Sequence, residues 1–250
     1  MANKRKKTKI VATLGPATSK KETLKARLDE GVNVFRINFS HANYDDVKTR
    51  INLIRELNEE YGYNAAILGD LQGPKVRVGK MQEEVIVNEG DEIVFVTGKR
   101  FEGTKERVYM TYDRFTQDAK PGERILLDDG KLFFEVVSTD KNNEVTAKVI
   151  QGGPLKSKKG VNLPNNNISQ PALTQKDIKD AIFAIEQQVD WIALSFVRHA
   201  EDLMQLEELI KEHSAHKIPI IAKIEKPEAV ENIDKIVAYC DGLMVARGDL

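Results

Sequence analysis

Charged side chains end two apolar stretches near the end of the printed sequence. Residues 220–225 read Ile-Ile-Ala-Lys-Ile-Glu, and residues 241–249 end in Ala-Arg-Gly-Asp after an apolar run. In an extended strand Lys223 and Glu225 would share one face, because successive side chains point to opposite faces. A buried charge is costly unless it is paired or binds a metal. With Asp249 at the end of the second stretch, the pattern predicts either a structural Lys-Glu pair or an active-site cluster at strand ends.

A second polar series lies on an earlier strand. Arg36, Asn38 and Ser40 alternate with apolar residues and would share one face. The planar charged group of arginine suits a phosphate or carboxylate, and asparagine and serine supply neutral oxygens for a cation. Asp70 ends the next apolar run and Ser195 ends a later one. Strand ends of this kind meet at one face of a barrel, where barrel enzymes bind their substrates.

Apolar strands alternate with amphipathic helices in two parts of the chain. Strands are expected over residues 9–14, 32–40, 65–71, 191–197, 218–226 and 242–245. The intervening helices are expected over residues 19–31, 44–61, 178–187, 200–213 and 227–239. This alternation predicts a parallel sheet covered by helices, resembling an unfinished eight-stranded barrel. A doubly wound sheet is the alternative, although no Gly-x-Gly-x-x-Gly follows the first strand.

The pattern changes between the two helical parts. Short β-like runs separated by Gly, Pro, Asn and Asp turns occupy residues 85–87, 92–96, 107–111, 124–127, 131–137 and 144–150. We therefore expect residues 1–73 to form the first part of a barrel, 74–170 an inserted all-β domain, and 171–250 a truncated second part.

Composition excludes several classes of protein. The 250 residues are 41% hydrophobic with a formal net charge of −1, so no overall field attracts nucleic acid. The longest apolar runs fall far short of the roughly 20 residues that a membrane helix needs. The single cysteine, Cys240, excludes a disulfide within these residues and fits a reducing compartment. We expect a cytoplasmic protein with no nucleic-acid or membrane partner.

At this point the chain resembles the pyruvate kinase family. The resemblance covers essentially the whole chain, and the motifs that carry it lie at residues 8–17, 36–41, 73–77, 127–130, 157–164, 195–198, 221–225 and 244–250. The resemblance implies an α/β fold, a TIM-type (β/α)8 barrel that is incomplete in this chain. It also implies that a small all-β lid domain is inserted after the third strand.

The resemblance implies a phosphotransferase that converts phosphoenolpyruvate and ADP into pyruvate and ATP, the last step of glycolysis. Glu225 and Asp249 would hold Mg²⁺ or Mn²⁺, whose preferred ligands are hard oxygens. Arg36 and Lys223 would be catalytic, and would bind the substrate together with Gly248 and Asp249. When full length, the protein would be a homotetramer.

Two further groups of residues follow from the same resemblance. Arg77, Lys158 and Lys159 would bind the nucleotide, with Asp128 or Asp129 as further candidates. Potassium-activated members have a glutamate where this chain has a lysine in its Asp-Leu-Gln-Gly-Pro-Lys segment, residues 70–75. The monovalent-cation site or its replacement would therefore comprise Asn38, Ser40, Asp70, Leu71 and Lys75, with no requirement for potassium.

Two other functions remain open from the residues. A magnesium-dependent carbon-carbon lyase of the pyruvate-enolate barrel type also uses Glu and Asp, although it does not need the β insertion with Lys158 and Lys159. A non-catalytic remnant is the other alternative. Because the family's proton-transfer segment and last two strands would follow Leu250, residues 1–250 alone are expected to be inactive.

Overall fold

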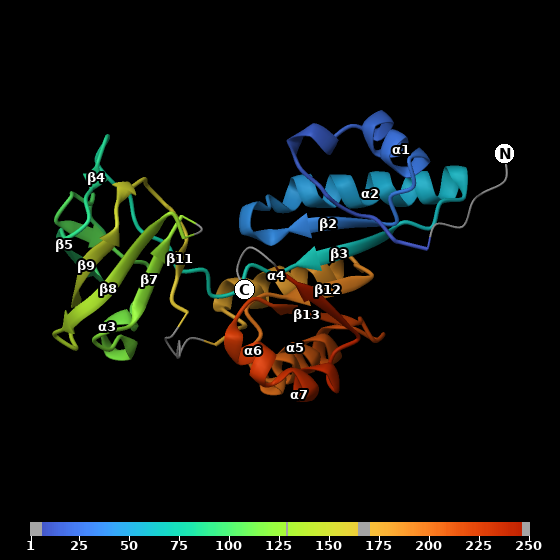
Figure 1. Ribbon diagram of the computed structural model, residues 1–250. Coiled ribbons are helices and arrows are strands. Elements are labelled where there is room, and N and C mark those ends of the chain that lie inside the picture. The colour runs from blue at the N-terminus through green and yellow to red at the C-terminus, as the bar shows by residue number, and fades with distance from the viewer. Residues whose placement is uncertain (1–6, 129, 165–170, 247–250) are drawn as a thin grey trace. The chain divides into compact units, whose positions relative to one another are not determined.

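The computed structural model describes residues 7–128, 130–164 and 171–246. The chain forms two compact units, which we call the barrel unit and the β unit. It passes from the barrel unit to the β unit between Gly73 and Pro74 and returns between Pro171 and Ala172. In Figure 1 the barrel unit holds the blue and red segments, and the β unit holds the green and most of the yellow ones.

The barrel unit contains one six-stranded parallel sheet among the described residues. Its strands are β1 (Val11–Thr13), β2 (Val34–Asn38), β3 (Ala66–Asp70), β12 (Trp191–Leu194), β13 (Ile220–Ile224) and β14 (Gly242–Val245), and they follow one another across the sheet in chain order. A doubly wound sheet reverses its strand order partway. The doubly wound alternative is therefore wrong, and the open six-stranded sheet agrees with an incomplete barrel.

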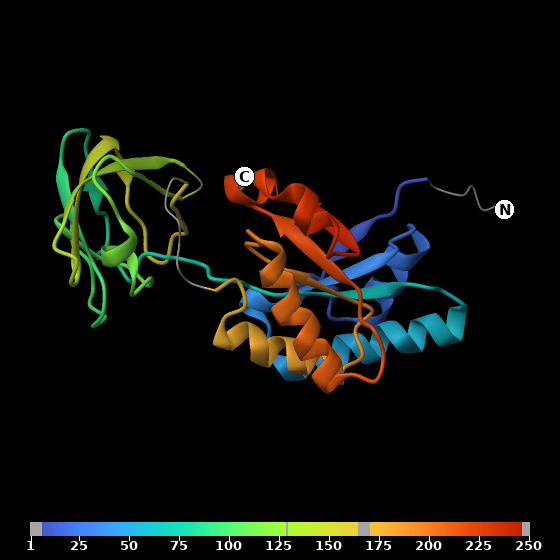
Figure 2. The ribbon, with the colours of Figure 1, turned by 90° about the horizontal axis from the view of Figure 1, so that it is seen from below.

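Helices connect these strands. They are α1 (Lys21–Asp29), α2 (Tyr44–Tyr61), α4 (Gln175–Glu186), α5 (Ala200–His213), α6 (Pro227–Glu231) and α7 (Ile233–Val237), with short 3-10 helices η1 (Pro16–Thr18) and η2 (Phe39–His41). The single helix predicted over residues 227–239 is thus divided at Asn232. Figures 1 and 2 show α2 and α4 next to each other, and Tyr44 on α2 donates a hydrogen bond to Asp180 on α4.

The helix α2 shows why these segments fold as they do. The Asn43 side chain accepts two backbone hydrogen bonds from the first turn, and Gly62 ends the helix in the left-handed conformation. The side chains that α2 buries are spaced three or four residues apart, at Val47, Ile51, Ile54 and Leu57. They join the apolar core of the barrel unit, which also includes side chains of β2, β3, β12 and β13.

The second strand is shorter than predicted. A strand was expected over residues 32–40, but β2 ends at Asn38 and η2 follows it. The Asn38 side chain accepts the Ser40 N–H at 3.0 Å, which turns the chain. Ser40 therefore does not continue the alternation of Arg36 and Asn38, because local side-chain hydrogen bonding competes with the strand.

The β unit is a mainly antiparallel sheet with order β11-β7-β8-β9-β5-β6 and a separate β10-β4 pair. Its elements are β4 (Ile86–Val87), β5 (Glu92–Val96), β6 (Arg107–Tyr109), α3 (Phe115–Asp118), β7 (Arg124–Leu127), β8 (Leu132–Thr139), β9 (Glu144–Gln151), β10 (Gly153–Pro154) and β11 (Val161–Asn162). The short helix α3 was not expected from the sequence. Its Phe115 packs edge-to-face on Phe95, which in turn contacts Phe134, and these three buried rings lie in the core of the unit.

Within the described residues, none of the helices has the length and apolar character that spanning a membrane would require.

Candidate active site at the ends of the barrel strands

A buried carboxylate lies between two cations at the end of β3. Asp70 is 1% exposed, and its Oδ2 is 2.5 Å from Arg36 Nε on β2. Its Oδ1 is 3.3 Å from Lys223 Nζ on β13. Asp70 pairs in register with Asn38, so the polar ends of β2 and β3 are adjacent. The sheet therefore brings three of the predicted site residues into one ionic cluster.

Lys223 has three polar partners. Its Nζ is 3.0 Å from Glu225 Oε1 and donates a hydrogen bond of 2.7 Å to Ser195 Oγ, in addition to its contact with Asp70. The Lys-Glu pair left open by the sequence is present, but it belongs to a larger group. Since the ammonium is held from three sides, its position at the strand ends is fixed.

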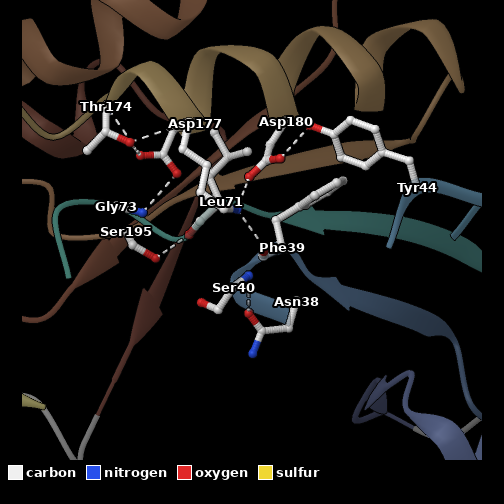
Figure 3. Close-up of polar contacts among 11 residues, drawn as sticks. Asn38, Phe39, Ser40, Tyr44, Leu71, Gly73, Thr174, Asp177, Asp180 and Ser195 are labelled. Carbon is white, nitrogen blue, oxygen red and sulfur yellow. Dashed lines mark hydrogen bonds and ion pairs between the residues drawn. The ribbon is translucent and has the colours of Figure 1, made fainter. Parts of the chain in front are cut away.

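Ser195 links this cluster to the segment that follows β3. The hydroxyl of this buried residue donates a hydrogen bond of 2.6 Å to the Leu71 carbonyl while it accepts from Lys223. Figure 3 shows Ser195 and Leu71 facing each other. Leu71 therefore contributes its carbonyl, because its side chain is buried in the core.

Glu225 is the described member of the predicted metal pair. It is 3% exposed, and its Oε2 accepts the Phe196 N–H at 2.7 Å. Its carboxylate oxygens are donors of the kind that Mg²⁺ prefers. Asp249 and Gly248 lie outside the described residues. Among the residues that the structure describes, no group of three His, Cys, Asp or Glu side chains gathers that could hold a metal ion.

The monovalent-cation candidates are divided between the units. Asn38 and Ser40 lie together after β2, as Figure 3 shows, and Asp70 and Leu71 end β3. Lys75 is exposed and belongs to the β unit. The charge of Asp70 is already compensated inside the barrel unit by Arg36 and Lys223.

The predicted nucleotide residues are neighbours within the β unit. Arg77 Nη1 donates a hydrogen bond of 2.9 Å to the Lys158 carbonyl, and Lys159 Nζ is 2.8 Å from Asp128 Oδ1. The hydrogen bond from Lys159 lowers the pKa of Asp128 below its ordinary value, so this carboxylate is ionised near neutral pH. Asp129 lies outside the described residues.

A cavity at the ends of β1 and β2 was not predicted from the sequence. Its volume is about 320 Å³, and its wall combines apolar Leu14, Pro16 and Ile37 with polar His41 and Arg50. The Gly15-Pro16 turn after the first strand was the available signal, because a turn at a barrel strand end shapes the substrate face.

Two buried acidic side chains on α4, Asp177 and Asp180, were also not predicted from the sequence. Asp180 accepts hydrogen bonds from Tyr44 at 2.7 Å and Lys176 at 2.5 Å, and Lys176 also donates to the Phe39 carbonyl at 2.7 Å. Burial and the hydrogen bond to Asp180 raise the pKa of Tyr44 to about 12, so its hydroxyl keeps its proton. Asp177, one helical turn earlier on α4, accepts the Gly73 N–H at 2.9 Å and the Thr174 N–H at 3.0 Å. Helical spacing alone does not distinguish such acids from solvated ones.

Comparison with known proteins decides the family. A model of the pyruvate kinase barrel domain matches residues 5–250. The chain belongs to the pyruvate kinase family. This match and the open parallel sheet together confirm the predicted incomplete α/β barrel.

Curated pyruvate kinases resemble the chain over almost its whole length. The pyruvate kinase of Corynebacterium glutamicum is 44% identical over 245 residues, which is 98% of this chain and 51% of the relative. That of Corynebacterium efficiens is 45% identical with the same coverage, and that of Bacillus licheniformis is 44% identical over 98% of this chain and 42% of the relative. The chain thus spans about half the length of the curated pyruvate kinases that it matches.

Replacing Ser195 by alanine should destabilise the barrel unit by about 1–3 kcal/mol, because Lys223 and the Leu71 carbonyl both lose a buried partner. The matched control is Ser214→Ala, because Ser214 also donates to one carbonyl and accepts one N–H, but near the surface. It should change stability by less than about 0.5 kcal/mol. Urea denaturation followed by fluorescence of Trp191, the only tryptophan, measures both variants. Equal losses would contradict a special role of Ser195.

Proposed function

We propose that the full-length protein containing this chain transfers the phosphoryl group of phosphoenolpyruvate to ADP, giving pyruvate and ATP in the last step of glycolysis. The observation that carries the proposal is the ionic cluster at the ends of barrel strands, in which partly exposed Arg36 meets buried Asp70, Lys223 and Glu225. A phosphoryl-transfer site must place fixed charges around the group that moves. We further propose that the protein acts in the cytoplasm as a homotetramer, without nucleic-acid or membrane partners.

Arg36 is suited to hold the phosphate. Its Nε contacts Asp70 and its Nη1 donates to the Thr13 hydroxyl at 2.9 Å, so the plane of the guanidinium is fixed from two neighbouring strands. Its side chain is still 25% exposed. A planar, permanently charged group in a fixed orientation is the usual partner of phosphate oxygens.

Lys223 is suited to stabilise charge that develops during transfer. Its ammonium is nearly buried, where electrostatic interactions are stronger than in water, and its three partners hold it without rearrangement. We assign to it the neutralisation of charge on the phosphoryl oxygens and on the enolate of the product. A preorganised charge of this kind lowers the barrier because the protein does not reorganise during the step.

The metal would be held by Glu225 and Asp249, with Gly248 and Asp249 next to the substrate. The described member of the pair, Glu225, is buried at a strand end and supplies hard oxygen ligands. A bound Mg²⁺ or Mn²⁺ would neutralise negative charge on the phosphate and the enolpyruvate oxygen. Since Glu225 Oε1 also contacts Lys223, the same carboxylate orients the ammonium.

For the nucleotide we propose a basic group within the β unit, where Arg77 Nη1 donates to the Lys158 carbonyl and Lys159 pairs with Asp128. Arg77, Lys158 and Lys159 of the β unit would bind the phosphates, for which their charge is suited.

The lyase alternative is not favoured. The relatives that match 98% of this chain are pyruvate kinases. A lyase also gives no reason for the basic group of Arg77, Lys158 and Lys159 in the β unit. No observation specifically favours a non-catalytic remnant.

The primary experiment is a coupled assay of pyruvate formation by the full-length protein with phosphoenolpyruvate, ADP and Mg²⁺. Glu225→Gln should lower turnover roughly 100-fold or more and weaken Mg²⁺ binding, because a hard cation loses an anionic ligand. The control Glu207→Gln alters an exposed acid that pairs with Lys211 and should behave as the unmodified protein. Full activity and metal affinity of Glu225→Gln would remove Glu225 from the site, and no pyruvate from the unmodified protein would refute the function.

A second experiment concerns potassium. We propose that Lys75 supplies the positive charge that a monovalent ion gives in members with glutamate at this position, so activity should be nearly independent of potassium. Lys75→Glu should create a requirement, because the added negative charge needs a cation to offset it. Lys99→Glu, the same change at another exposed lysine of the β unit, should not. Initial rates in potassium and in a large inert cation measure this, and strong activation of the unmodified protein would contradict it.

A further inference from the structure

A buried carboxylate on α4 joins the two places where the chain leaves and re-enters the barrel unit. Asp177 Oδ1 accepts the Gly73 N–H at 2.9 Å, and its Oδ2 accepts the Thr174 N–H at 3.0 Å and a hydrogen bond from the Thr174 hydroxyl. Gly73 immediately precedes the β unit, and Thr174 follows its end by three residues. Figure 3 shows Asp177 between the two.

Helix capping explains only half of this arrangement. In a capping box the third helical residue bonds back to the N-cap, as Asp177 does with Thr174. The bond to Gly73, which is 104 residues away in the chain, is not needed for the cap. Because Asp177 is fully buried, its charge must be compensated, and three converging donors together with the helix N-terminus do so.

The Gly73 end of this contact is tightly packed. Gly73 has a φ of +69°, and a Cβ there would lie 2.8 Å from Phe196 Cδ2 and 2.9 Å from Ser195 Cβ. Only glycine fits this position without displacement. The N–H of Gly73 therefore points to Asp177 while its Cα lies against the turn that follows β12.

The same short segment reaches Lys223. The Leu71 carbonyl accepts from Ser195, whose hydroxyl accepts from Lys223. Residues 71–73 are thus fastened to the ionic cluster at one end and to Asp177 at the other. A change in the direction in which the chain leaves at Gly73 would act on the partner of Lys223.

We propose that Asp177 is a positioning residue for the transfer reaction: it fixes the backbone on both sides of the β insertion, so that the Leu71 carbonyl stays on Ser195 and Lys223 keeps its position. The proposal rests on the function proposed above. A carboxylate is required because two acceptor oxygens serve two separate segments. An asparagine has a single acceptor oxygen and adds two donors, so it satisfies either Gly73 or Thr174, but not both.

The test compares Asp177→Asn with Asp180→Asn in the full-length protein. Asp180 lies three residues further along α4, is 2% exposed, and bonds to Tyr44 and Lys176 but not to residues 71–73. Asp177→Asn should lower kcat/KM for ADP roughly tenfold, because Lys223 is then held less firmly in the position that transfer requires. The affinity for phosphoenolpyruvate, measured with Mg²⁺ present, should change less than about twofold, because Arg36 and Glu225 are unaltered. Asp180→Asn should leave both constants near those of the unmodified protein.

Hydrogen exchange of the peptide containing Gly73 gives a readout that does not depend on activity. Exchange there should be faster in Asp177→Asn than in Asp180→Asn at equal temperature below the melting point. If Asp177→Asn does not fold, Asp177→Glu tests the contact, because a glutamate keeps the charge and the capping box but displaces the oxygen that accepts the Gly73 N–H, and the same selective loss in kcat/KM for ADP is expected.

Two results would overturn the proposal. One is equal exchange and equal ADP kinetics in Asp177→Asn and Asp180→Asn, and the other is unchanged ADP kinetics together with faster exchange at Gly73 in Asp177→Glu. If the unmodified protein forms no pyruvate, the proposed function fails separately, and the exchange comparison alone decides whether Asp177 holds Gly73.

Discussion

The nearly complete burial of Asp70 is the constraint on which the site depends. An ionised carboxylate in this position needs cations within contact distance, and Arg36 and Lys223 provide them from β2 and β13. Removing one member of a buried ion pair typically costs about 3–5 kcal/mol, because the remaining charge is left uncompensated. The strands that carry these residues must therefore end at the same level, which also places Glu225 and Ser195 next to Lys223.

This constraint extends beyond the charged side chains. Ser195 connects Lys223 to the backbone after β3, because it accepts from Lys223 and donates to the Leu71 carbonyl. Two residues further on, Asp177 accepts the N–H of Gly73. The point at which the β unit is inserted is thus linked to the proposed catalytic lysine through the backbone of residues 71–73, which is hydrogen-bonded at both ends. An insertion at this position can influence the chemistry without contributing to the ionic cluster itself.

The sequence predicted those parts of this arrangement that follow from the alternation of side chains along a strand and from the position of polar residues at strand ends. Alternation in 220–225 placed Lys223 and Glu225 on one face, and the repeated strand and helix pattern indicated the incomplete barrel. It did not predict that β2 stops at Asn38, because that depends on a local bond from the Ser40 N–H to the Asn38 side chain. The contact of Asp177 with Gly73 could not be found either, since helical spacing does not show which distant backbone group a buried acid meets.

The central claim is that Asp70 and Lys223 stabilise each other across β12, which lies between their strands. A double-mutant cycle with Asp70→Asn, Lys223→Met and the double variant tests it directly, using urea denaturation of residues 1–250 followed by Trp191 fluorescence. We expect the double variant to lose about 1–3 kcal/mol less than the sum of the two single losses. Losses that add to within about 0.5 kcal/mol would show that the two charges are not coupled and would contradict the account.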